Sequence, residues 1–439
     1  MPRKTVLLLA VAIPLSCLLI AAAYNLPPVH DRLAWRVDEL RARLKYALNP
    51  PEEAVFIPSG GAPLAGLPDP QVAVTFLPTE TPSPTPSLPG PTVTPAPTAT
   101  PTITPTPLPE QVSLSGVKYE DQHGRWNYCG PANLSMALTF WGWDGNRDVV
   151  GGYVKPEDKD KNVMPYEMQD FVETQTEGMA ALVRSGGDLE LLKRMLAAGF
   201  PVLVEKGYYE YDYTGKLGWL GHYQFVTGYD ETQDRLTVQD TYVKDGKNHK
   251  VSYAEFIEGW RSFNYLFLMV FPQDRQAEVL ALLGPYADPD WANSHALEVA
   301  EAESGELSGI DQFFAWFNRG TSHASLQQYP DAAAAFDQAF SLYANLPDDG
   351  TRPYRMIWYQ TWPYWAYFYS GRYQDVIDLA NTTLNDTISE PVLEESFYWR
   401  GLAREALGDA PGALDDMRES VRLNPNFTPG WEQLSRLGG

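Results

Sequence analysis

The sequence contains very little cysteine, with only Cys17 and Cys129 among its 439 residues. Because Cys17 lies inside an apolar stretch near the N-terminus, the rest of the chain holds a single thiol and cannot form an internal disulfide. A lone thiol is often only a small buried hydrophobic group. In an exported protein, however, it also favours a reactive role, which makes Cys129 a candidate nucleophile.

Positive charge is scarce as well, since 33 lysine and arginine residues stand against 56 aspartate and glutamate residues. The net charge of -23 repels phosphate backbones and anionic lipid headgroups, so nucleic acid is not a predicted partner. No pair of histidines or cysteines in the sequence has the spacing of metal ligands, and we expect neither a catalytic metal nor another cofactor. With 44% hydrophobic residues the chain can fill a full-sized core, and its length predicts two or three domains.

The N-terminus combines a basic flank at Met1–Lys4 with an apolar run at Thr5–Ala23. The run has roughly the length of a membrane-spanning helix, about 20 residues. We therefore predict that residues 1–25 anchor the protein in the cell membrane by a single span, with its soluble domains outside the cytoplasm. The alternative is a signal peptide cleaved after Ala21–Ala23, which would give a secreted protein.

Two segments separate this run from the first predicted domain. Residues 26–77 form a juxtamembrane segment, in which Asp31–Leu48 has leucines at helical spacing between basic residues. That pattern is typical of an amphipathic helix on a membrane or of a plain solvated helix. Residues 78–109 are almost entirely threonine, proline and serine, which predicts an extended linker without a core.

Residues 110–273 carry a mixture of helical and strand patterns. Apolar residues at helical spacing predict helices, and short β-branched runs predict strands. The predicted helices are 131–141, 166–176 and 189–198, and the predicted strands are 200–204, 223–227, 235–238 and 265–271. Helices therefore precede strands, which predicts an α+β domain whose antiparallel sheet packs against the leading helix.

Residues 310–439 follow a predicted helical connector at residues 274–309 and carry the pattern of paired helices. Small and aromatic residues recur around Ala332, Val376 and Ala413, and these positions resemble tetratricopeptide repeats, which implies an all-α repeat domain. The segment has no lysine, nine arginines and seventeen acidic residues, so a groove between its helices favours a basic or neutral ligand. We expect the repeats either to dock a substrate or protein partner or to brace the preceding domain.

The most specific chemical signal surrounds Cys129, which directly precedes Gly130 and Pro131 at the predicted start of a helix. A thiol in that position lies at the positive end of the helix dipole, which stabilises the thiolate. Gln122 lies seven residues earlier. Its amide could join the backbone N–H of Cys129 in an oxyanion hole for acyl transfer.

A thiolate needs a base, and His222 at the start of an apolar strand is the best candidate among six histidines. The next strand leads to Asp240. A loop after Tyr229 would pair that residue with Arg235. The same register would set Asp240 opposite Gln224, which makes Asp240 a diagonal neighbour of His222 on one face of the sheet. Asp240 would then orient the imidazole and stabilise its charged form, unless it is only a turn residue.

The composite pattern Gln…Cys-Gly-Pro-Ala…His-Tyr…Val-Thr-Gly-Tyr-Asp…Asp resembles the double-glycine leader peptidases of bacteriocin exporters and their stand-alone extracytoplasmic relatives, a papain-like family. The resemblance implies a thiol-dependent peptidase that acts on a peptide or protein substrate. The implied roles are nucleophile for Cys129, base for His222, orienting carboxylate for Asp240 and oxyanion donor for Gln122. Unlike the exporter enzymes, this sequence shows no adjoining transporter segments, so a double-glycine leader substrate is not implied.

Two other functions stay open beside the peptidase, namely a cell-wall amidase with similar thiol chemistry and an inactive peptide-binding or scaffold protein. Two aromatic segments bear on substrate binding. Lys206–Leu220 holds four tyrosines and Trp219, which form either a loop at the lip of the substrate site or packing beneath the sheet. Trp358–Tyr369 carries more aromatic surface than one helix face needs, so part of it should lie against the peptidase domain or in the repeat groove.

Overall fold

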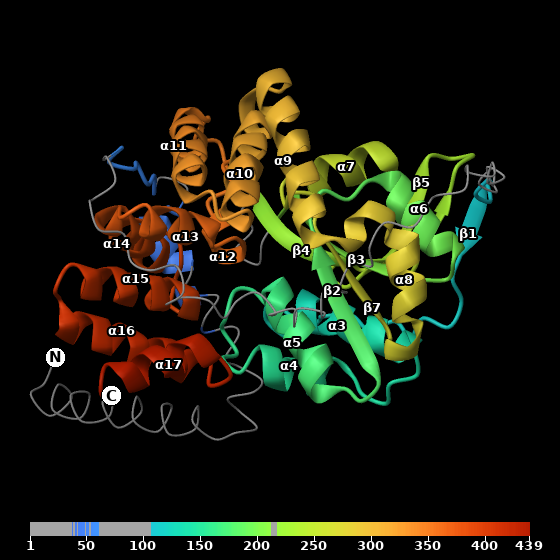
Figure 1. Cartoon of the computed structure of the whole chain (residues 1–439), viewed down its shortest axis with the longest axis horizontal. Coiled ribbons are helices and arrows are strands. Elements are labelled where there is room, and N and C mark those ends of the chain that lie inside the picture. Colours follow the sequence, from blue (N-terminus) through green and yellow to red (C-terminus); the bar gives the residue numbers. More distant parts are fainter. Residues whose placement is uncertain are drawn as a thin grey trace, which may run out of the picture.

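The computed structural model describes residues 37, 40–41, 43–48, 50–51, 54–60, 107–211 and 217–439. The predicted anchor at residues 1–25 and most of the predicted linker at residues 78–109 lie outside this part of the chain. Among the described helices, none is long and apolar enough to cross a membrane. Figure 1 shows a sheet-containing half beside a helical half that is formed by the C-terminal residues.

A seven-stranded antiparallel sheet forms the centre of the first half (Figure 1). Its order is β2-β7-β3-β4-β5-β6, and β1 pairs with β4. The strands are β1 Gln111–Ser113, β2 Met179–Arg184, β3 Val202–Tyr211, β4 Leu217–Asp230, β5 Arg235–Asp240, β6 His249–Ser252 and β7 Phe267–Pro272. β4 lies between β3 and β5 and is far longer than the predicted strand at 223–227, because it begins at Leu217 and ends at Asp230.

Helices cover both faces of this sheet, because alternate strand residues point to opposite sides. On β3, Leu203 joins a core with α3, α4 and α5, whereas Val202 and Val204 join a second core with α6, α7 and α8. The helices are α3 Cys129–Phe140, α4 Arg147–Val154, α5 Pro165–Gln175, α6 Leu189–Ala197, α7 Tyr253–Arg261 and α8 Gln276–Leu283. The predicted α+β class is confirmed, although α4, β2 and α7 were not predicted.

The second half consists of helices that pack against their neighbours in sequence, above all α10 with α11 and α15 with α16. They are α9 Pro289–Glu306, α10 Gly309–Ser325, α11 Tyr329–Asn345, α12 Met356–Tyr359, α13 Trp362–Tyr369, α14 Tyr373–Asn381, α15 Glu394–Ala406, α16 Ala410–Leu423 and α17 Thr428–Arg436. Glycine allows two of these close contacts, because a Cβ added at Gly320 would lie 2.7 Å from the ring of Phe336, and one at Gly401 would lie 2.9 Å from Met417. The predicted all-α class is confirmed, and the arrangement fits a repeat domain.

The short segment before the predicted linker packs on the helical half. Phe56 is 6% exposed, and its ring lies edge-on to Phe340 with 5.0 Å between centroids. The backbone N–H and the hydroxyl of Ser59 donate to the carboxylate of Asp375 at 2.8 and 2.9 Å. The described residues between 37 and 48 are helical, as predicted. Part of the predicted juxtamembrane segment therefore contacts the helical half directly.

An aromatic contact joins the two halves. The ring of Trp219 on β4 stacks on Phe263 with 5.7 Å between centroids, and both belong to the same buried cluster as Phe314 and Tyr359 of the helical half. Gln360 adds a buried hydrogen bond to the carbonyl oxygen of Ser262 at 2.7 Å. Part of the aromatic segment at residues 358–369 thus lies against the first half, which was one of the two predicted positions.

A cluster of carboxyl groups lies buried at a second contact between the halves. Side-chain oxygens of Glu167 on α5 and of Glu394 and Glu395 on α15 all lie within 4.8 Å of one another. Asn424 Nδ2 donates to Glu167 Oε1 and Glu394 Oε1, each at 2.8 Å, and the Tyr166 hydroxyl donates to Glu395 Oε1 at 2.9 Å. Burial, together with nearby carboxylates, raises the pKa of Glu394 to about 8 and that of Glu395 to about 7.

Candidate active site

Cys129 is the first residue of α3, two residues earlier than the predicted helix start. Pro131 suits the first helical turn, where a missing backbone N–H leaves no bond unmade. Gly130 lets the helix approach a neighbouring loop, since a Cβ added there would lie 3.0 Å from the Cβ of Val163. The thiol therefore lies at the positive end of a helix that packs closely against the sheet-containing half.

His222 lies on β4, and its side chain is buried. Asn133, one turn after Cys129, ties α3 to this strand. Its Nδ2 donates to the carbonyl oxygens of Cys129 and Tyr223, each at 2.9 Å. His222 consequently lies close enough to Cys129 for its imidazole to lower the pKa of the thiol.

Asp240 is the last residue of β5 and is also buried. Its Oδ1 lies 3.1 Å from His222 Nε2, which leaves Nδ1 as the ring nitrogen for the thiol of Cys129. The same carboxylate accepts hydrogen bonds from the backbone N–H of Tyr242 at 2.8 Å and from Gln224 Nε2 at 2.6 Å. The carboxylate is therefore fixed from three sides while it faces the imidazole.

The three groups shift one another's pKa values. Burial would raise the pKa of the Cys129 thiol, but the hydrogen bond and positive charge of His222 lower it overall. Burial would lower the pKa of His222, yet the charge of Asp240 raises it to about 10. Burial would likewise raise the pKa of Asp240, yet the charge of His222 holds it well below the usual range. These shifts favour a thiolate and an imidazolium beside an ionised carboxylate.

The strand register agrees with the prediction at the site but not at the turn. Gln224 lies opposite Asp240, as predicted. At the turn, however, Arg235 pairs with Asp230, so the predicted pair was wrong by one residue. An irregularity in β4 after Val226 absorbs the difference, because one extra residue on one strand restores the register further along.

Gln122 lies in the loop before α3 and is mostly buried. Its backbone N–H donates to the carbonyl oxygen of Thr241, and its side-chain Oε1 accepts from the Thr241 hydroxyl, both at 2.9 Å. Because Thr241 directly follows Asp240, the amide is held beside the carboxylate that faces His222. With Oε1 occupied, Nε2 is the amide atom oriented to donate to a substrate oxygen.

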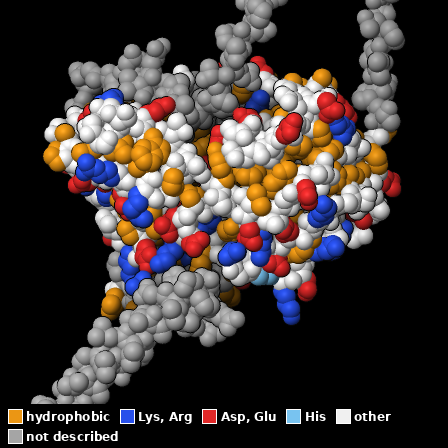
Figure 2. Space-filling model, turned by 90° about the horizontal axis from the view of Figure 1, so that it is seen from below, with side chains coloured by type: hydrophobic (Ala, Val, Ile, Leu, Met, Phe, Trp, Pro, Cys, Tyr) orange, Lys and Arg blue, Asp and Glu red, His pale blue; other side chains and the backbone are white. Residues whose placement is uncertain are grey.

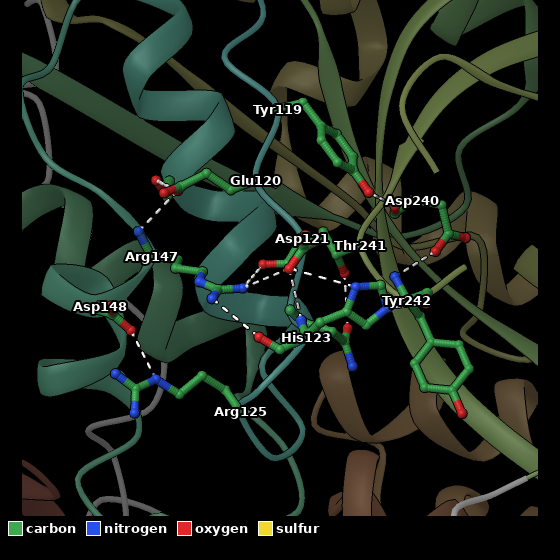
Figure 3. A network of polar contacts seen from close by, with 12 residues as sticks. Tyr119, Glu120, Asp121, His123, Arg125, Arg147, Asp148, Asp240, Thr241 and Tyr242 are labelled. Carbon is green, nitrogen blue, oxygen red and sulfur yellow. Dashed lines mark hydrogen bonds and ion pairs between the residues drawn. The ribbon is translucent and has the colours of Figure 1, made fainter. Parts of the chain in front are cut away.

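Arg147 on α4 fixes the loop around Gln122, as Figure 3 shows. Its guanidinium donates to the carbonyl oxygen of Asp121 and, at 3.2 Å, to that of His123. The ring of His123 in turn lies 2.8 Å from the carbonyl oxygen of Tyr242. The loop is thus bound on one side to α4 and on the other to the residues after β5, which limits how far the amide of Gln122 can move.

The aromatic segment at residues 206–220 is not a free loop, because its described residues continue β3 and β4. Both predicted roles occur within it. The ring of Tyr208 lies edge-on to His222 with 5.5 Å between centroids, whereas Trp219 packs in the contact between the halves. Tyr242 covers another side of the imidazole at 6.3 Å. Aromatic rings therefore shield the imidazole of His222 from water.

Glu205 on β3 is a buried carboxyl group near the site that the sequence analysis missed. It pairs with Tyr223 across the strands, and its Oε1 has no hydrogen-bond partner among the described residues. Burial, reinforced by the charge of Cys129, raises its pKa well above the usual range. A neutral Glu205 adds no negative charge beside the thiolate. The available signal was an acidic residue directly after the apolar run 200–204.

A cavity of about 220 Å³ adjoins Gln122 and receives side chains from both halves. Residues of the sheet-containing half in its lining include Trp126, Lys161 and Tyr242, and Tyr359 is one of those that come from the helical half. No pattern in the sequence brings Lys161 and Tyr359 to one site, because the two meet only where the halves pack together.

Among the described residues, one group has the geometry of metal ligands, namely Glu167, Glu394 and Glu395. These side chains belong to the contact between the halves and not to the thiol–imidazole site. The chemistry that the candidate active site supports, a nucleophilic thiolate with a proton donor and an oxyanion donor, is carried by protein side chains alone.

A helix-borne thiol, an imidazole on the sheet and an orienting carboxylate on an α+β fold define the papain-like class of arrangement. Residues 114–267 match the model of the Peptidase_C39 like family. The resemblance predicted from the motifs is therefore confirmed for residues 114–267. The match supports a cysteine peptidase in general terms.

Two solved structures are similar to this region. One is described as a C39-like peptidase from Bacillus anthracis, with 17% identity and a TM-score of 0.30, and the similarity covers 37% of this chain and 97% of that chain. The other is the peptidase domain of Streptococcus ComA, a bi-functional ABC transporter involved in a quorum-sensing pathway, with 17% identity, a TM-score of 0.26, and coverage of 34% and 93%. No curated protein matches the chain.

Proposed function

We propose that this protein hydrolyses peptide bonds through a Cys129–His222–Asp240 triad, with Gln122 as oxyanion donor. The observation that carries the proposal is the buried contact of 3.1 Å between His222 Nε2 and Asp240 Oδ1, beside a thiol whose pKa His222 lowers. A helix N-terminus and an imidazolium together lower the thiol pKa, which supplies a nucleophile at neutral pH.

In the first step the Cys129 thiolate attacks the carbonyl carbon of the scissile peptide bond. The carbonyl oxygen becomes an oxyanion, which accepts hydrogen bonds from Gln122 Nε2 and from the backbone N–H of Cys129. When the tetrahedral intermediate collapses, the C–N bond breaks and His222 gives its proton to the departing amine. A thioester on Cys129 remains.

In the second step water attacks the thioester carbon, and His222 now accepts the proton of that water. The C–S bond breaks, the carboxylic acid product leaves, and the thiolate–imidazolium pair is restored. Asp240 keeps Nε2 of the imidazole bound throughout, so Nδ1 faces the sulfur in both steps. No step needs a redox change or a further reactant besides water.

The helical half contributes to substrate binding in this proposal, because Tyr359 and neighbouring residues line the cavity beside Gln122. The substrate would thus be bound between the two halves and not only in a groove of the helical half.

The protein acts outside the cytoplasm and is held at the membrane by residues 1–25. The basic flank and the apolar run support this location. Protease treatment of intact cells, which should remove the soluble domains, tests that location.

Incubation of the full chain with peptide mixtures and, separately, with peptidoglycan tests the activity. We expect new amino termini from peptides, none of them with the Cys129→Ala variant. Release of cell-wall fragments without peptide cleavage would favour the amidase. If neither substrate is cleaved and a thiol-directed electrophile leaves Cys129 unlabelled, the chain is instead an inactive binding protein.

A further inference from the structure

The cavity beside Gln122 is basic, although the whole chain carries a net charge of -23. Among the described residues, four cationic side chains line it and Glu390 is the one carboxylate. The cationic residues are Arg125, Lys159, Lys161 and Arg355. On the face in Figure 2, lysine and arginine side chains lie beside acidic ones and not in a patch of one sign, so the positive lining is a local feature.

Three of these cations already have partners. Arg125 Nε lies 3.1 Å from Asp148, and Lys159 Nζ lies 2.8 Å from Glu390 and so offsets the charge of that carboxylate. Arg355 donates to the carbonyl oxygen of Trp219 at 2.9 Å. These interactions hold the three side chains in place and leave one cation to be explained.

Lys161 has no ion-pair or hydrogen-bond partner among the described residues, although it is only partly exposed. The charged groups that act on it are Lys155, Lys159, Asp160 and Glu390. Burial, reinforced by the charge of Lys155, lowers its pKa to about 8. Asp160 and Glu390 offset this effect only in part, so a ligand that brings a further negative charge would stabilise the ammonium.

The loop that carries Lys161 is fixed to the start of α3. Asn127, two residues before Cys129, donates from Nδ2 to the carbonyl oxygen of Asp160 at 2.9 Å. Val163 contacts Gly130, the residue after the nucleophile. Gln122 and Lys161 line the same cavity, so a substrate whose carbonyl oxygen is bound by Gln122 can extend toward the ammonium of Lys161.

We propose that Lys161 forms a subsite for an acidic side chain of the peptide substrate, close to the bond that is cleaved. The subsite rests on the proposed peptidase function, and it adds a substrate class to it. The aromatic rings of Trp126 and Tyr359 in the same lining exclude water around the ion pair, which strengthens it. The negative charge of the remaining surface disfavours strongly acidic proteins, so the preferred substrate carries an isolated acidic residue.

The test uses pairs of internally quenched peptides that differ only by Glu or Gln at one position near the scissile bond. Their C-termini are amidated, so that a terminal carboxylate cannot replace the side chain. For the wild-type chain we expect kcat/KM to favour Glu about tenfold or more at one position. The Lys161→Met variant should lose this preference while its kcat/KM for the Gln peptide stays within about twofold, and Lys161→Glu should reverse it. Lys247→Met, at an exposed lysine, is the matched control and should keep the preference.

The subsite can be tested apart from catalysis by measuring the binding of both peptides to Cys129→Ala. Tighter binding of the Glu peptide, lost in the Cys129→Ala/Lys161→Met double variant, would support the subsite even if no peptide were cleaved. A Glu to Gln ratio near one at every position, or a ratio unchanged by Lys161→Met, would overturn it. A different result would contradict the proposed peptidase function, namely equal cleavage of peptides by the wild-type chain and by Cys129→Ala. Melting temperatures of all variants check that the fold is kept.

Discussion

The candidate active site and the contact between the two halves both bury carboxyl groups, but with opposite effects on the pKa. Although burial would raise the pKa of Asp240, the charge of His222 and three hydrogen bonds lower it. At the contact, burial and neighbouring carboxylates raise the pKa of Glu394 and Glu395. Charge is therefore kept where the attraction of a cation and hydrogen bonds outweigh burial, and is removed by protonation where burial and neighbouring acids outweigh the attraction of Lys155.

The two regions therefore have different roles, one in the proposed reaction and the other in holding the two halves together. The active site holds ionised groups that can exchange protons with a substrate, and strand register keeps them together. The carboxyl groups at the contact between the halves are neutral at low pH. Their contribution to the stability of the contact is therefore greatest in acid. Variants in the two regions should accordingly change different measurements, one set changing turnover and the other stability.

The largest effect is expected from Cys129→Ala, which removes the nucleophile. We expect turnover of peptides to fall by about 10⁵-fold or more, because no other group forms the acyl intermediate. The free energy of unfolding should change by less than about 1 kcal/mol, since Ala fits the space of the thiol. A residual rate within about tenfold of the wild type would show that the thiol is not the nucleophile.

Asp240→Asn should lower kcat by about 10²- to 10³-fold, because the imidazole loses its orienting charge. The carboxylate raises the pKa of His222 to about 10, so its removal lets that pKa fall. Activity needs the imidazolium as proton donor, and the alkaline limit of the pH–rate profile should therefore move to lower pH. The pH dependence of kcat/KM measures this shift. An unchanged alkaline limit would contradict the role of Asp240.

Phe56→Ala should destabilise the helical half by about 3 kcal/mol, because a buried aromatic ring is lost from its contact with Phe340 and Tyr367. Turnover of short peptides at low temperature should stay within about threefold of the wild type. Ile57→Ala is the matched control, since Ile57 is 74% exposed. Equal effects of the two substitutions on chemical unfolding would show that the segment before the linker does not support the helical half.

Glu394→Gln should change the free energy of unfolding least, and at high pH it should raise that free energy instead of lowering it. A carboxyl whose folded pKa is raised binds more protons in the folded state, so stability falls as pH rises from about 4.5 to about 8. The neutral amide removes this dependence and should stabilise the chain by about 1–3 kcal/mol above pH 8. Unfolding by urea across this pH range gives the measurement, with the exposed Glu432→Gln as control. A wild-type stability that rises over the same range would contradict the raised pKa.

Local signals were sufficient for two residues of the candidate active site. Cys129 before a Gly-Pro helix start and His222 on an apolar strand are both visible in a few neighbouring residues. The opposition of Gln224 and Asp240 was also predicted, although the irregularity after Val226 that makes it possible was not. A bulge depends on how three strands fit together, and no short pattern in the sequence encodes it.

Residues that meet across the two halves could not be predicted in this way. In the sequence, Lys161 does not differ from the other charged residues of the run Lys155–Lys161. Tyr359 likewise does not differ from the other aromatic residues of its segment. Their position beside the same cavity follows from the packing of Trp219 against the helical half. The strand residues 206–211 of β3 and 217–220 of β4 were missed for a related reason, because their aromatic side chains suited both a loop and a strand.

The central claim is that Cys129 exists as a thiolate paired with the imidazolium of His222. The most direct test is the rate of alkylation of Cys129 by iodoacetamide in the full chain as a function of pH, with mass spectrometry to separate the product from that of Cys17. The account predicts a rate that changes by less than about threefold between pH 6 and pH 8, and a pH-dependent rate in His222→Ala. A wild-type rate that rises about tenfold per pH unit over this range, as for an ordinary thiol with a pKa of about 8.5, would contradict it.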